Sequence, residues 1–250
     1  MCGTCGCSDA GAQRNGNPGS ADPHSHTVVL EQKVLARNDE LAAANRAWLA
    51  ERDLFAVNLM SSPGSGKTTL LERTIRELAA AVPVAVVEGD QETAFDAERI
   101  RATGCRAVQV NTGAGCHLDA AMVSGALRCL DPAQGSVVFV ENVGNLVCPA
   151  LFDLGEASRA VVTSVTEGAD KPLKYPHMFR TADLVLVNKT DLLPYVDFDV
   201  DRFDEHLSRV NPNARVIRIS ATRGDGMPHW YAWLRDMVGG ITGQTRGGCR

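Results

Sequence analysis

The apolar segment Ala56 to Met60 runs directly into the glycine-rich loop Ser61-Ser-Pro-Gly-Ser-Gly-Lys-Thr68, and a helical pattern follows. Gly64 and Gly66 allow the backbone to turn so that its N–H groups face a phosphate. The start of a helix adds the positive end of the helix dipole. This order of strand, loop and helix predicts a phosphate-binding P-loop, although the usual motif begins with glycine where this chain has Ser61.

Six consecutive residues of this loop and helix are predicted to contact phosphates: Gly64, Ser65, Gly66, Lys67, Thr68 and Thr69. We expect Lys67 to reach the β- and γ-phosphates and the Thr68 hydroxyl to bind Mg²⁺. Asp90 and Glu141 each close a predicted buried strand, where ligands bind in such sheets. The predicted catalytic and magnesium residues are therefore Lys67, Thr68, Asp90 and Glu141, and the alternative for each acid is a solvated strand end.

The segment Glu141-Asn-Val-Gly144 resembles the Asp-x-x-Gly switch of GTPases, with Glu in place of Asp. A backbone amide in such a segment can change its orientation when the γ-phosphate is lost. We therefore expect the conformation of this segment to depend on the nucleotide.

A second nucleotide motif, Asn188-Lys-Thr-Asp191, follows another predicted strand and matches the Asn-Lys-x-Asp sequence that recognises guanine. The Asp191 carboxylate would accept hydrogen bonds from guanine N1–H and the exocyclic amine, an arrangement that adenine lacks. Asn188 would brace the loop and the Lys189 side chain would cover the base. Ser220-Ala221, after a further strand, supports this interpretation, so GTP or GDP is the expected ligand; the alternative is a polar turn.

Short apolar runs without polar alternation recur along the chain and are typical of strands buried on both faces of a parallel sheet. They span residues 54–60, 82–87, 107–110, 137–140, 160–165, 184–187 and 216–219. Helical patterns span residues 28–52, 68–80, 96–102, 118–130, 203–210 and 227–237, and residues 239–250 are expected to fray. The alternation predicts a doubly wound α/β domain with a mostly parallel sheet over residues 28–250.

Residues 1–27 differ from the rest because they hold almost no aliphatic side chains beyond alanine. Such a segment cannot bury enough apolar surface to order itself, so we expect a flexible tail. Its Cys2, Cys5 and Cys7 can converge on one soft or borderline metal ion, and the alternative is a tail with idle thiols. His24 and His26 are too few to indicate a metal store.

The net charge of −5, without a basic run, argues against nucleic acid as a partner. No apolar stretch approaches the roughly 18 residues needed to span a bilayer. The N-terminus lacks the pattern of a signal peptide, so the expected location is the cytoplasm, where disulfides are rare. The eight cysteines are accordingly interpreted as thiols, some of them as metal ligands.

A second group of metal-binding residue types lies inside the domain. Cys116 and His117 are predicted to begin the helix after the strand at 107–110, and Cys148 follows the segment that starts at Glu141. Thiolate and imidazole suit Zn²⁺ or Ni²⁺, and a second protomer could complete the ligand shell across a two-fold axis. Buried structural cysteines are an equally compatible alternative. The remaining cysteines and histidines are interpreted as structural, incidental or surface residues: Cys105, Cys129, Cys249, His177, His206 and His229.

Together these residues resemble the HypB family, the GTPases that assist nickel insertion into [NiFe]-hydrogenase. The resemblance covers nearly the whole chain. It includes Cys2-x-x-Cys5-Gly-Cys7, the P-loop with its flanks from Asn58 to Thr69, Asn111-Thr-Gly-Ala-Gly-Cys-His117, Glu141-Asn-Val-Gly-Asn-Leu-Val-Cys-Pro149, the segment from Ser164 to Pro176, and Asn188-Lys-Thr-Asp-Leu-Leu-Pro194. Ser61 at the start of the P-loop looks normal for this family.

The resemblance implies a fold of the signal-recognition/MinD-type P-loop class and a homodimer driven by GTP. It implies that Cys116, His117 and Cys148 of two copies meet at the dimer interface to hold nickel or zinc. It also implies a tight nickel site at Cys2, Cys5 and Cys7, and a HypA-type carrier that passes nickel on to the hydrogenase large subunit. Many members have a long histidine stretch in the tail, which this chain lacks.

The resulting hypothesis is a nickel metallochaperone switched by GTP and Mg²⁺, in which hydrolysis reshapes the segment that carries Cys148. Turnover is expected to be slow because no arginine finger or water-positioning glutamine is evident. By resemblance, Lys171 or Lys174 could reach the nucleotide across the dimer, and the alternative is a solvated basic loop. The competing functions are a urease- or cobalamin-pathway GTPase, disfavoured by the three-cysteine tail, and a nickel store, disfavoured by the few histidines.

Overall fold

The structure, a computed structural model, describes residues 23–90, 95–113 and 115–244. Cys2, Cys5, Cys7 and Cys249 lie outside the described residues, as do the side chains of His24 and His26. The chain divides into two units, Met1–Val34 and Leu35–Arg250, and the packing described below is that of the second unit.

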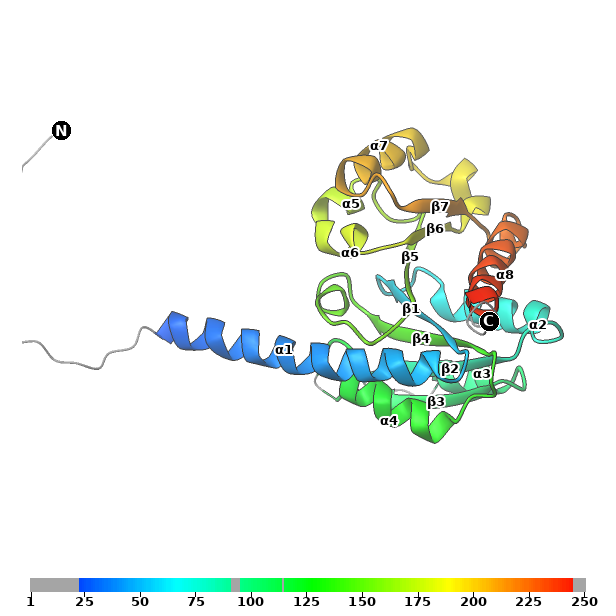
Figure 1. Cartoon of the computed structure of the whole chain (residues 1–250). Coiled ribbons are helices and arrows are strands. Elements are labelled where there is room, and N and C mark those ends of the chain that lie inside the picture. Colours follow the sequence, from blue (N-terminus) through cyan, green and yellow to red (C-terminus); the bar gives the residue numbers. More distant parts are fainter. Residues whose placement is uncertain (1–22, 91–94, 114, 245–250) are drawn as a thin grey trace, which may run out of the picture. The chain divides into compact units, whose positions relative to one another are not determined.

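Strands and helices alternate along the described chain, as Figure 1 shows. The strands are β1 (Phe55–Ser61), β2 (Val84–Asp90), β3 (Arg106–Asn111), β4 (Val137–Gly144), β5 (Ser158–Ser164), β6 (Leu184–Asn188) and β7 (Arg215–Arg218). The α-helices are α1 (Pro23–Ala50), α2 (Lys67–Leu78), α3 (Phe95–Arg101), α4 (Ala120–Leu130), α5 (Lys171–Lys174), α6 (Pro176–Arg180), α7 (Val200–Val210) and α8 (Met227–Gln244). Two short 3₁₀ helices are η1 (Cys148–Leu151) and η2 (Thr190–Tyr195).

The strands form one sheet in the order β3-β2-β4-β1-β5-β6-β7, and every described pairing is parallel. This confirms the predicted doubly wound α/β class. β1 lies between β4 and β5, so the P-loop leaves the middle of the sheet. The register of β1 and β4 pairs Leu59 with Glu141 and Ser61 with Gly144, which places the predicted switch segment beside the P-loop.

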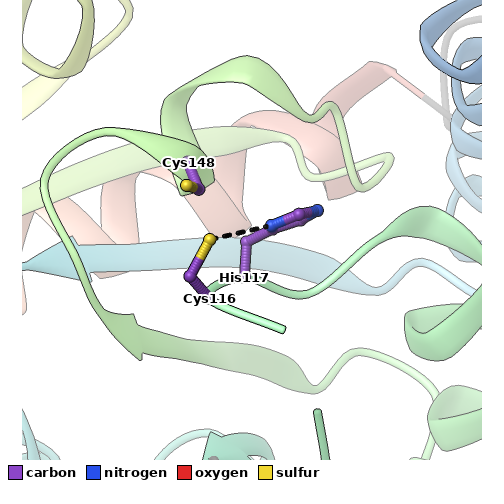
Figure 2. A group of neighbouring side chains, drawn as sticks. All are labelled: Cys116, His117 and Cys148. Carbon is purple, nitrogen blue, oxygen red and sulfur yellow. Dashed lines mark hydrogen bonds between the residues drawn. The ribbon is translucent and has the colours of Figure 1, made fainter. Parts of the chain in front are cut away.

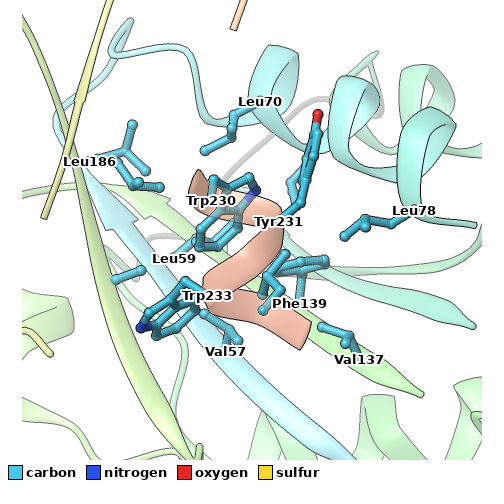
Figure 3. Packing of buried hydrophobic residues seen from close by; sticks show 14 of the residues in the cluster. Val57, Leu59, Leu70, Leu78, Val137, Phe139, Leu186, Trp230, Tyr231 and Trp233 are labelled. Atoms are coloured by element: carbon cyan, nitrogen blue, oxygen red, sulfur yellow. The ribbon is translucent and has the colours of Figure 1, made fainter. Parts of the chain in front are cut away.

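Alternate residues of the central strands pack against helices on opposite faces, because successive side chains of a strand point in opposite directions. Val57 and Leu59 of β1 pack with α2 and α8, where Trp230 and Trp233 are stacked with ring centroids 5.3 Å apart (Figure 3). Ala56 faces the cluster that includes Leu49 and side chains of α4, and Met60 faces the cluster of α6 and α7. Burial on both faces explains why these strands are continuous apolar runs.

Several element boundaries differ from the sequence prediction. The first helix begins at Pro23 rather than Val28. The helix α4 begins only at Ala120, because Asp119 caps it by accepting from the Met122 N–H at 2.8 Å, so Cys116, His117 and Leu118 lie in the preceding loop. The strand β4 runs on to Gly144, so Glu141 lies within the strand and not at its end. The helix α8 continues to Gln244, where fraying was expected from residue 239, and Val238 packs against the core.

One of the three histidines expected at the surface is buried. His206, expected at the surface, is buried, and its Nδ1 lies 2.9 Å from the Ala169 carbonyl oxygen because α7 packs over the loop after β5. His177 and His229 are exposed, as expected.

Among the described helices, none is long and apolar enough to cross a membrane.

Candidate functional site: a nucleotide pocket and a thiol–imidazole cluster

The P-loop connects β1 to α2 and needs glycine at two positions. Gly64 (φ +74°) and Gly66 (φ +97°) both adopt the left-handed conformation that side chains other than glycine rarely adopt. A Cβ atom on Gly66 would also lie only 2.6 Å from Nδ2 of Asn188. Gly66 is therefore fixed both by its backbone conformation and by the close approach of the second nucleotide motif.

A cavity of about 540 Å³ opens at the start of α2. The whole predicted phosphate loop from Gly64 to Thr69 lines it, together with Asp90, Glu141, Gly144 and Lys189. The fold thus brings the predicted phosphate and magnesium residues to one site, although they come from three separate segments of the sequence. The volume lies within the range of small-molecule sites in proteins.

Three polar residues that line this cavity, Lys67, Thr68 and Glu141, are buried and have close hydrogen-bond partners. The Nζ atom of Lys67 donates to Ser61 Oγ at 2.6 Å, and the Thr68 hydroxyl donates to Glu141 Oε1 at 2.9 Å. Glu88 of β2 stands opposite Glu141 of β4 in the parallel register. The Oε2 atoms of both acids are buried and accept no hydrogen bond from the described residues.

Burial shifts the pKa values of Lys67, Glu88 and Glu141, and their charges on one another modify these shifts. Burial raises the pKa of Glu141 to about 7, against the charge of Lys67 and the hydrogen bond from Thr68. Burial, followed by repulsion from Glu141, raises the pKa of Glu88 to about 8. Burial lowers the pKa of Lys67, and nearby acids oppose that shift. Two buried carboxylates with unpaired oxygens beside a P-loop threonine form a donor set that suits a hard divalent cation such as Mg²⁺.

The predicted guanine motif is tied directly to the P-loop. Asn188 Nδ2 donates to the Ser65 carbonyl oxygen at 2.9 Å, and Asn188 Oδ1 accepts from the Ala221 N–H at 3.0 Å. Lys189 Nζ donates to the Gly64 carbonyl oxygen at 2.7 Å. The Ser220 hydroxyl donates to Asp191 Oδ1 at 2.6 Å, which orients that carboxylate. The base motif and the phosphate loop therefore form one hydrogen-bonded unit, in which Asn188 bridges Ser65 and Ala221.

The second predicted site is a cluster of Cys116, His117 and Cys148, shown in Figure 2. One ligand atom from each residue lies within 4.8 Å of the others, and Cys116 Sγ is 3.6 Å from His117 Nδ1. Ligand atoms bound about 2.0–2.3 Å from one ion lie at most about 4.6 Å apart, so small adjustments would bring the three onto a common ion. All three residues are half-buried.

Two groups of this cluster, the Cys148 thiol and the His117 imidazole, have shifted pKa values. A hydrogen bond with the Cys116 thiol, followed by burial, raises the pKa of Cys148. Burial lowers the pKa of His117, which favours the neutral imidazole that binds metals. The His117 ring also stacks on Phe152, with centroids 3.9 Å apart. Cys105 and Cys129 lie outside the cluster, and burial raises the pKa of Cys105 to about 11.

The two sites are joined by a short stretch of chain at the end of β4. A Cβ atom on Gly144 would lie 3.2 Å from Cα of Pro63, so the backbone of β4 lies against the P-loop there. The next residue, Asn145, accepts through Oδ1 from the Val147 N–H at 2.8 Å and from the Cys148 N–H at 3.4 Å. The P-loop contact at Gly144 and the Cys148 ligand therefore lie only four positions apart in the sequence, with Asn145 shaping the turn between them.

Several residues of the two sites were not predicted from the sequence. Arg99 of α3 lines the nucleotide cavity, where its Nη2 donates to Glu72 at 2.6 Å and to the Thr69 hydroxyl at 3.3 Å. Phe152 and Asn145 support the cluster, as described above. An arginine downstream of the Asp90 strand was the available signal for Arg99. Asn145 and Phe152 carry no group typical of a metal ligand, so their residue types did not indicate a role in the cluster.

The two lysines with an open role are both paired. Lys171 contacts Glu167 at 3.1 Å, and Glu167 in turn accepts from the P-loop Ser62 hydroxyl at 2.5 Å. Lys174 contacts Asp170 at 2.7 Å and is largely exposed. Lys171 is therefore connected to the P-loop through one carboxylate, whereas Lys174 has the character of a solvated surface residue.

Comparison with known proteins agrees with this geometry. The family model described as "CobW/HypB/UreG, nucleotide-binding domain" matches residues 55–218, which include the P-loop, the cluster and the guanine motif. The fold and the site thus define a P-loop nucleotide-binding domain of that group. A hydrogenase maturation factor HypB from Azotobacter vinelandii is 59% identical over 215 residues, covering 86% of this chain and 71% of the relative. The chain belongs to the HypB family of hydrogenase maturation factors, a family of P-loop GTPases.

Further relatives support the same assignment. HypB from Escherichia coli K12 is 57% identical over 207 residues, covering 83% of this chain and 71% of the relative. The crystal structure of HypB from Archaeoglobus fulgidus aligns with a TM-score of 0.77 and 41% identity, covering 82% of this chain and 100% of that chain. HypB from Helicobacter pylori, solved in complex with nickel, aligns with a TM-score of 0.76 and 38% identity, covering 81% and 95%.

Proposed function

We propose that this protein is a GTP-hydrolysing metallochaperone that binds nickel and assists its delivery to [NiFe]-hydrogenase during maturation. In this proposal the GTPase cycle decides when the Cys116, His117 and Cys148 cluster holds nickel and when it releases it. The observation that carries the proposal is the short segment from Glu141 to Cys148, which borders the nucleotide cavity at one end and supplies a ligand of the cluster at the other.

The nucleotide cavity supports GTP and GDP as ligands. The P-loop and its helix would hold the phosphates through Gly64, Ser65, Gly66, Lys67, Thr68 and Thr69. Thr68, Asp90 and Glu141 would hold Mg²⁺, whose role is to neutralise charge that develops on the phosphates. Lys67 is well placed to contact a phosphate, because its hydrogen-bond acceptor, Ser61 Oγ, belongs to the phosphate loop itself. Asn188, Lys189, Asp191, Ser220 and Ala221 would hold guanine and reject adenine.

The thiol–imidazole cluster supports nickel, or zinc, as its cargo. Thiolate and imidazole ligands suit both ions, and the solved Helicobacter pylori relative was crystallised with nickel. Three ligands from one chain leave at least one coordination position for another group. The second copy of a homodimer would supply it.

An apolar surface around the cluster supports dimerisation at that place. Val147 and Leu151, on either side of Cys148, are 53% and 51% exposed although both are large and apolar. Exposed apolar side chains beside a functional site are typical of an interaction surface. We infer that a GTP- or metal-bound homodimer forms here and brings two clusters together.

The proposed partners rest on the resemblance to hydrogenase maturation factors. A HypA-type nickel carrier is the proposed acceptor or donor of the metal, and the hydrogenase large subunit is its final destination, reached directly or through that carrier. Cys2, Cys5 and Cys7 of the tail form a second proposed nickel site with three thiolate ligands. The reaction would take place in the cytoplasm, where the thiols stay reduced.

The proposal is tested by loading the full chain with nickel and measuring metal transfer to a chromogenic chelator. We expect slow transfer with a non-hydrolysable GTP analogue and fast transfer after GTP is hydrolysed, with the dimer and monomer followed by size-exclusion chromatography. Cys148→Ser should remove the nucleotide-dependent part of the nickel-transfer rate. Equal transfer rates in all nucleotide states would contradict the proposal.

A test in cells separates a switch from a passive nickel store. Lys67→Ala, expressed in place of the natural chain, should fail to support hydrogenase maturation at limiting nickel. Arg76→Ala, on the exposed side of the same helix α2, should support it and is the matched control. Maturation that proceeds with Lys67→Ala would favour the nickel store.

A further inference from the structure

Asn142 is the residue directly after Glu141 in β4, and its side chain is buried with 1% exposure. Successive residues of a strand point to opposite faces of the sheet. Glu141 accordingly reaches Thr68 at the start of α2, whereas Asn142 reaches the loop before α4 on the other face. The strand β4 therefore carries one group for each site, back to back.

The contacts of Asn142 fix the orientation of its amide. Its Nδ2 donates to Asn58 Oδ1 at 3.3 Å, and the amide of Asn58 donates in turn to Glu156 Oε1 at 3.3 Å. Glu156 is held by an ion pair with Arg159 at 2.6 Å. This chain of partners leaves Oδ1 of Asn142 as the end that faces the loop.

That oxygen accepts from the backbone N–H of Leu118 at 3.2 Å. Leu118 is fully buried and directly follows His117 in the loop that carries both ligands Cys116 and His117. The Asn142 side chain thus attaches this loop to β4. The other ligand, Cys148, is attached to the end of the same strand through Asn145.

A second attachment lies at the start of α4, directly after this loop, and does not involve β4. Asn38 of α1, also buried, accepts through Oδ1 from the Ala120 N–H at 2.9 Å. Asn38 Nδ2 donates to the Asp153 carbonyl oxygen at 2.8 Å. Two buried asparagines therefore hold backbone N–H groups two positions apart, but only Asn142 adjoins an acid of the nucleotide cavity.

We propose that Asn142 is a positioning residue that couples the nucleotide cavity to the Cys116–His117 half of the metal cluster by fixing the Leu118 backbone to β4. A shift of Glu141 caused by the bound nucleotide moves β4, and Asn142 passes that shift to the loop across the sheet. Together with the Asn145 turn, both halves of the cluster then follow one strand. This inference rests on the proposed function, namely that nucleotide and metal binding are linked in this chain.

The test measures nickel affinity with GDP and with a non-hydrolysable GTP analogue, and takes the ratio of the two as the coupling factor. Coupling factors in proteins are typically about 5- to 150-fold. We expect a factor in this range for the natural chain. Asn142→Ala should lower the factor clearly below that of the natural chain and leave only the part that the Asn145 turn carries to Cys148. Asn38→Ala should keep the natural factor even if its nickel affinity is lower in both states. A purely structural role would lower nickel affinity equally in both states and leave the ratio unchanged, and this result would overturn the inference.

A second measurement needs no substitution and therefore does not depend on whether Asn142→Ala folds. Amide hydrogen exchange of the natural chain should show a change at Leu118 between GDP and the GTP analogue, with a smaller change at Ala120. Equal exchange at Leu118 in both states would contradict the inference. A coupling factor of one in the natural chain would instead contradict the proposed function, so the two failures are distinguishable.

Discussion

The nucleotide cavity and the thiol–imidazole cluster lie close together in the chain but are built differently. The cavity is bounded by strand ends and by the start of α2, and hydrogen bonds from Asn188 and Lys189 to P-loop carbonyls tie its two motifs together. The cluster is carried by two loops, its residues are half-buried, and single amides attach it to the sheet. The nucleotide cavity is therefore preorganised, whereas the cluster is held in place through β4, the strand that it shares with the cavity.

This difference suggests a division of roles between the two regions. A preorganised phosphate site recognises its ligand at little cost in conformational entropy. A loop-borne metal site can take up and release an ion because its ligand geometry can change by fractions of an ångström. Damage to the cavity should therefore remove the nucleotide dependence of nickel binding, whereas damage to the cluster should leave nucleotide binding in the absence of metal unchanged.

The largest effect is expected for Lys67→Ala. Lys67 is the buried cation of the phosphate loop, and removing such a group typically costs roughly 10²- to 10³-fold in rate. GTP hydrolysis should fall by about this factor, while nickel affinity without nucleotide should stay unchanged. A steady-state phosphate-release assay and a nickel titration of the same preparation would check both halves, and Arg76→Ala should behave as the natural chain. A loss of nickel affinity in the absence of nucleotide would contradict the conclusion that the two sites are built separately.

The next effect concerns the base. Asp191→Asn replaces an acceptor that Ser220 orients at 2.6 Å with a group that can donate toward guanine N1–H. The affinity for GDP should fall by about 100-fold, because a hydrogen bond to a charged group contributes about 1.5–3 kcal/mol. The affinity for xanthosine diphosphate should rise, because its base carries a carbonyl in place of the guanine amine and the Asn amide can donate to that carbonyl. Unchanged GDP affinity in a fluorescent-nucleotide titration would show that Asp191 does not contact the base.

A smaller and more selective effect is expected for Cys148→Ser. Loss of one of three ligands should weaken nickel binding at the cluster by at least about 10-fold, on the scale known for changes around a metal. GDP affinity in the absence of metal should not change, since Cys148 does not line the nucleotide cavity. Isothermal titration with the tail cysteines replaced would isolate the cluster. Cys129→Ser, at an exposed thiol outside the cluster, is the matched control.

The smallest effect is on stability and compares two glycines. Gly66→Ala should destabilise the domain by about 1–3 kcal/mol, because its φ of +97° is unfavourable for alanine and the new Cβ would displace Asn188. Gly125→Ala should instead stabilise it by about 0.5–1 kcal/mol, because Gly125 lies within α4 and its added Cβ would meet nothing within 4 Å. Urea unfolding of both variants would measure the two changes in stability. No loss of stability in Gly66→Ala would show that the P-loop is not held rigidly in its left-handed turn.

The parts of the molecule that local sequence determines were predictable. Buried strands read as apolar runs, and the P-loop and guanine motif each carry their chemistry in a few consecutive residues. The alternation of strands and helices was enough for the fold class. The residue types of the cluster, and their position at the carboxyl ends of strands, also led to the three side chains that the structure brings together.

The remaining features depend on contacts that are distant in sequence. Asn142 is an unremarkable amide until the Leu118 N–H, 24 positions away, meets its oxygen. His206 looked like a surface residue because α7 is strongly polar on one side, yet it lies on the side that covers the Ala169 carbonyl. The start of α4 was misplaced because the cap at Asp119 outweighs the helical pattern that Leu118 continues. These outcomes were fixed by packing and by single hydrogen bonds.

The most direct test of the account is a thermodynamic box on the natural chain with nickel and a non-hydrolysable GTP analogue in the presence of Mg²⁺. Nickel affinity is measured with GDP and with the analogue, and the ratio of analogue to GDP affinity is measured with and without nickel. The account predicts that the two measurements give the same factor and that this factor differs from one, since coupling between two sites is reciprocal. A factor of one in both directions would contradict it.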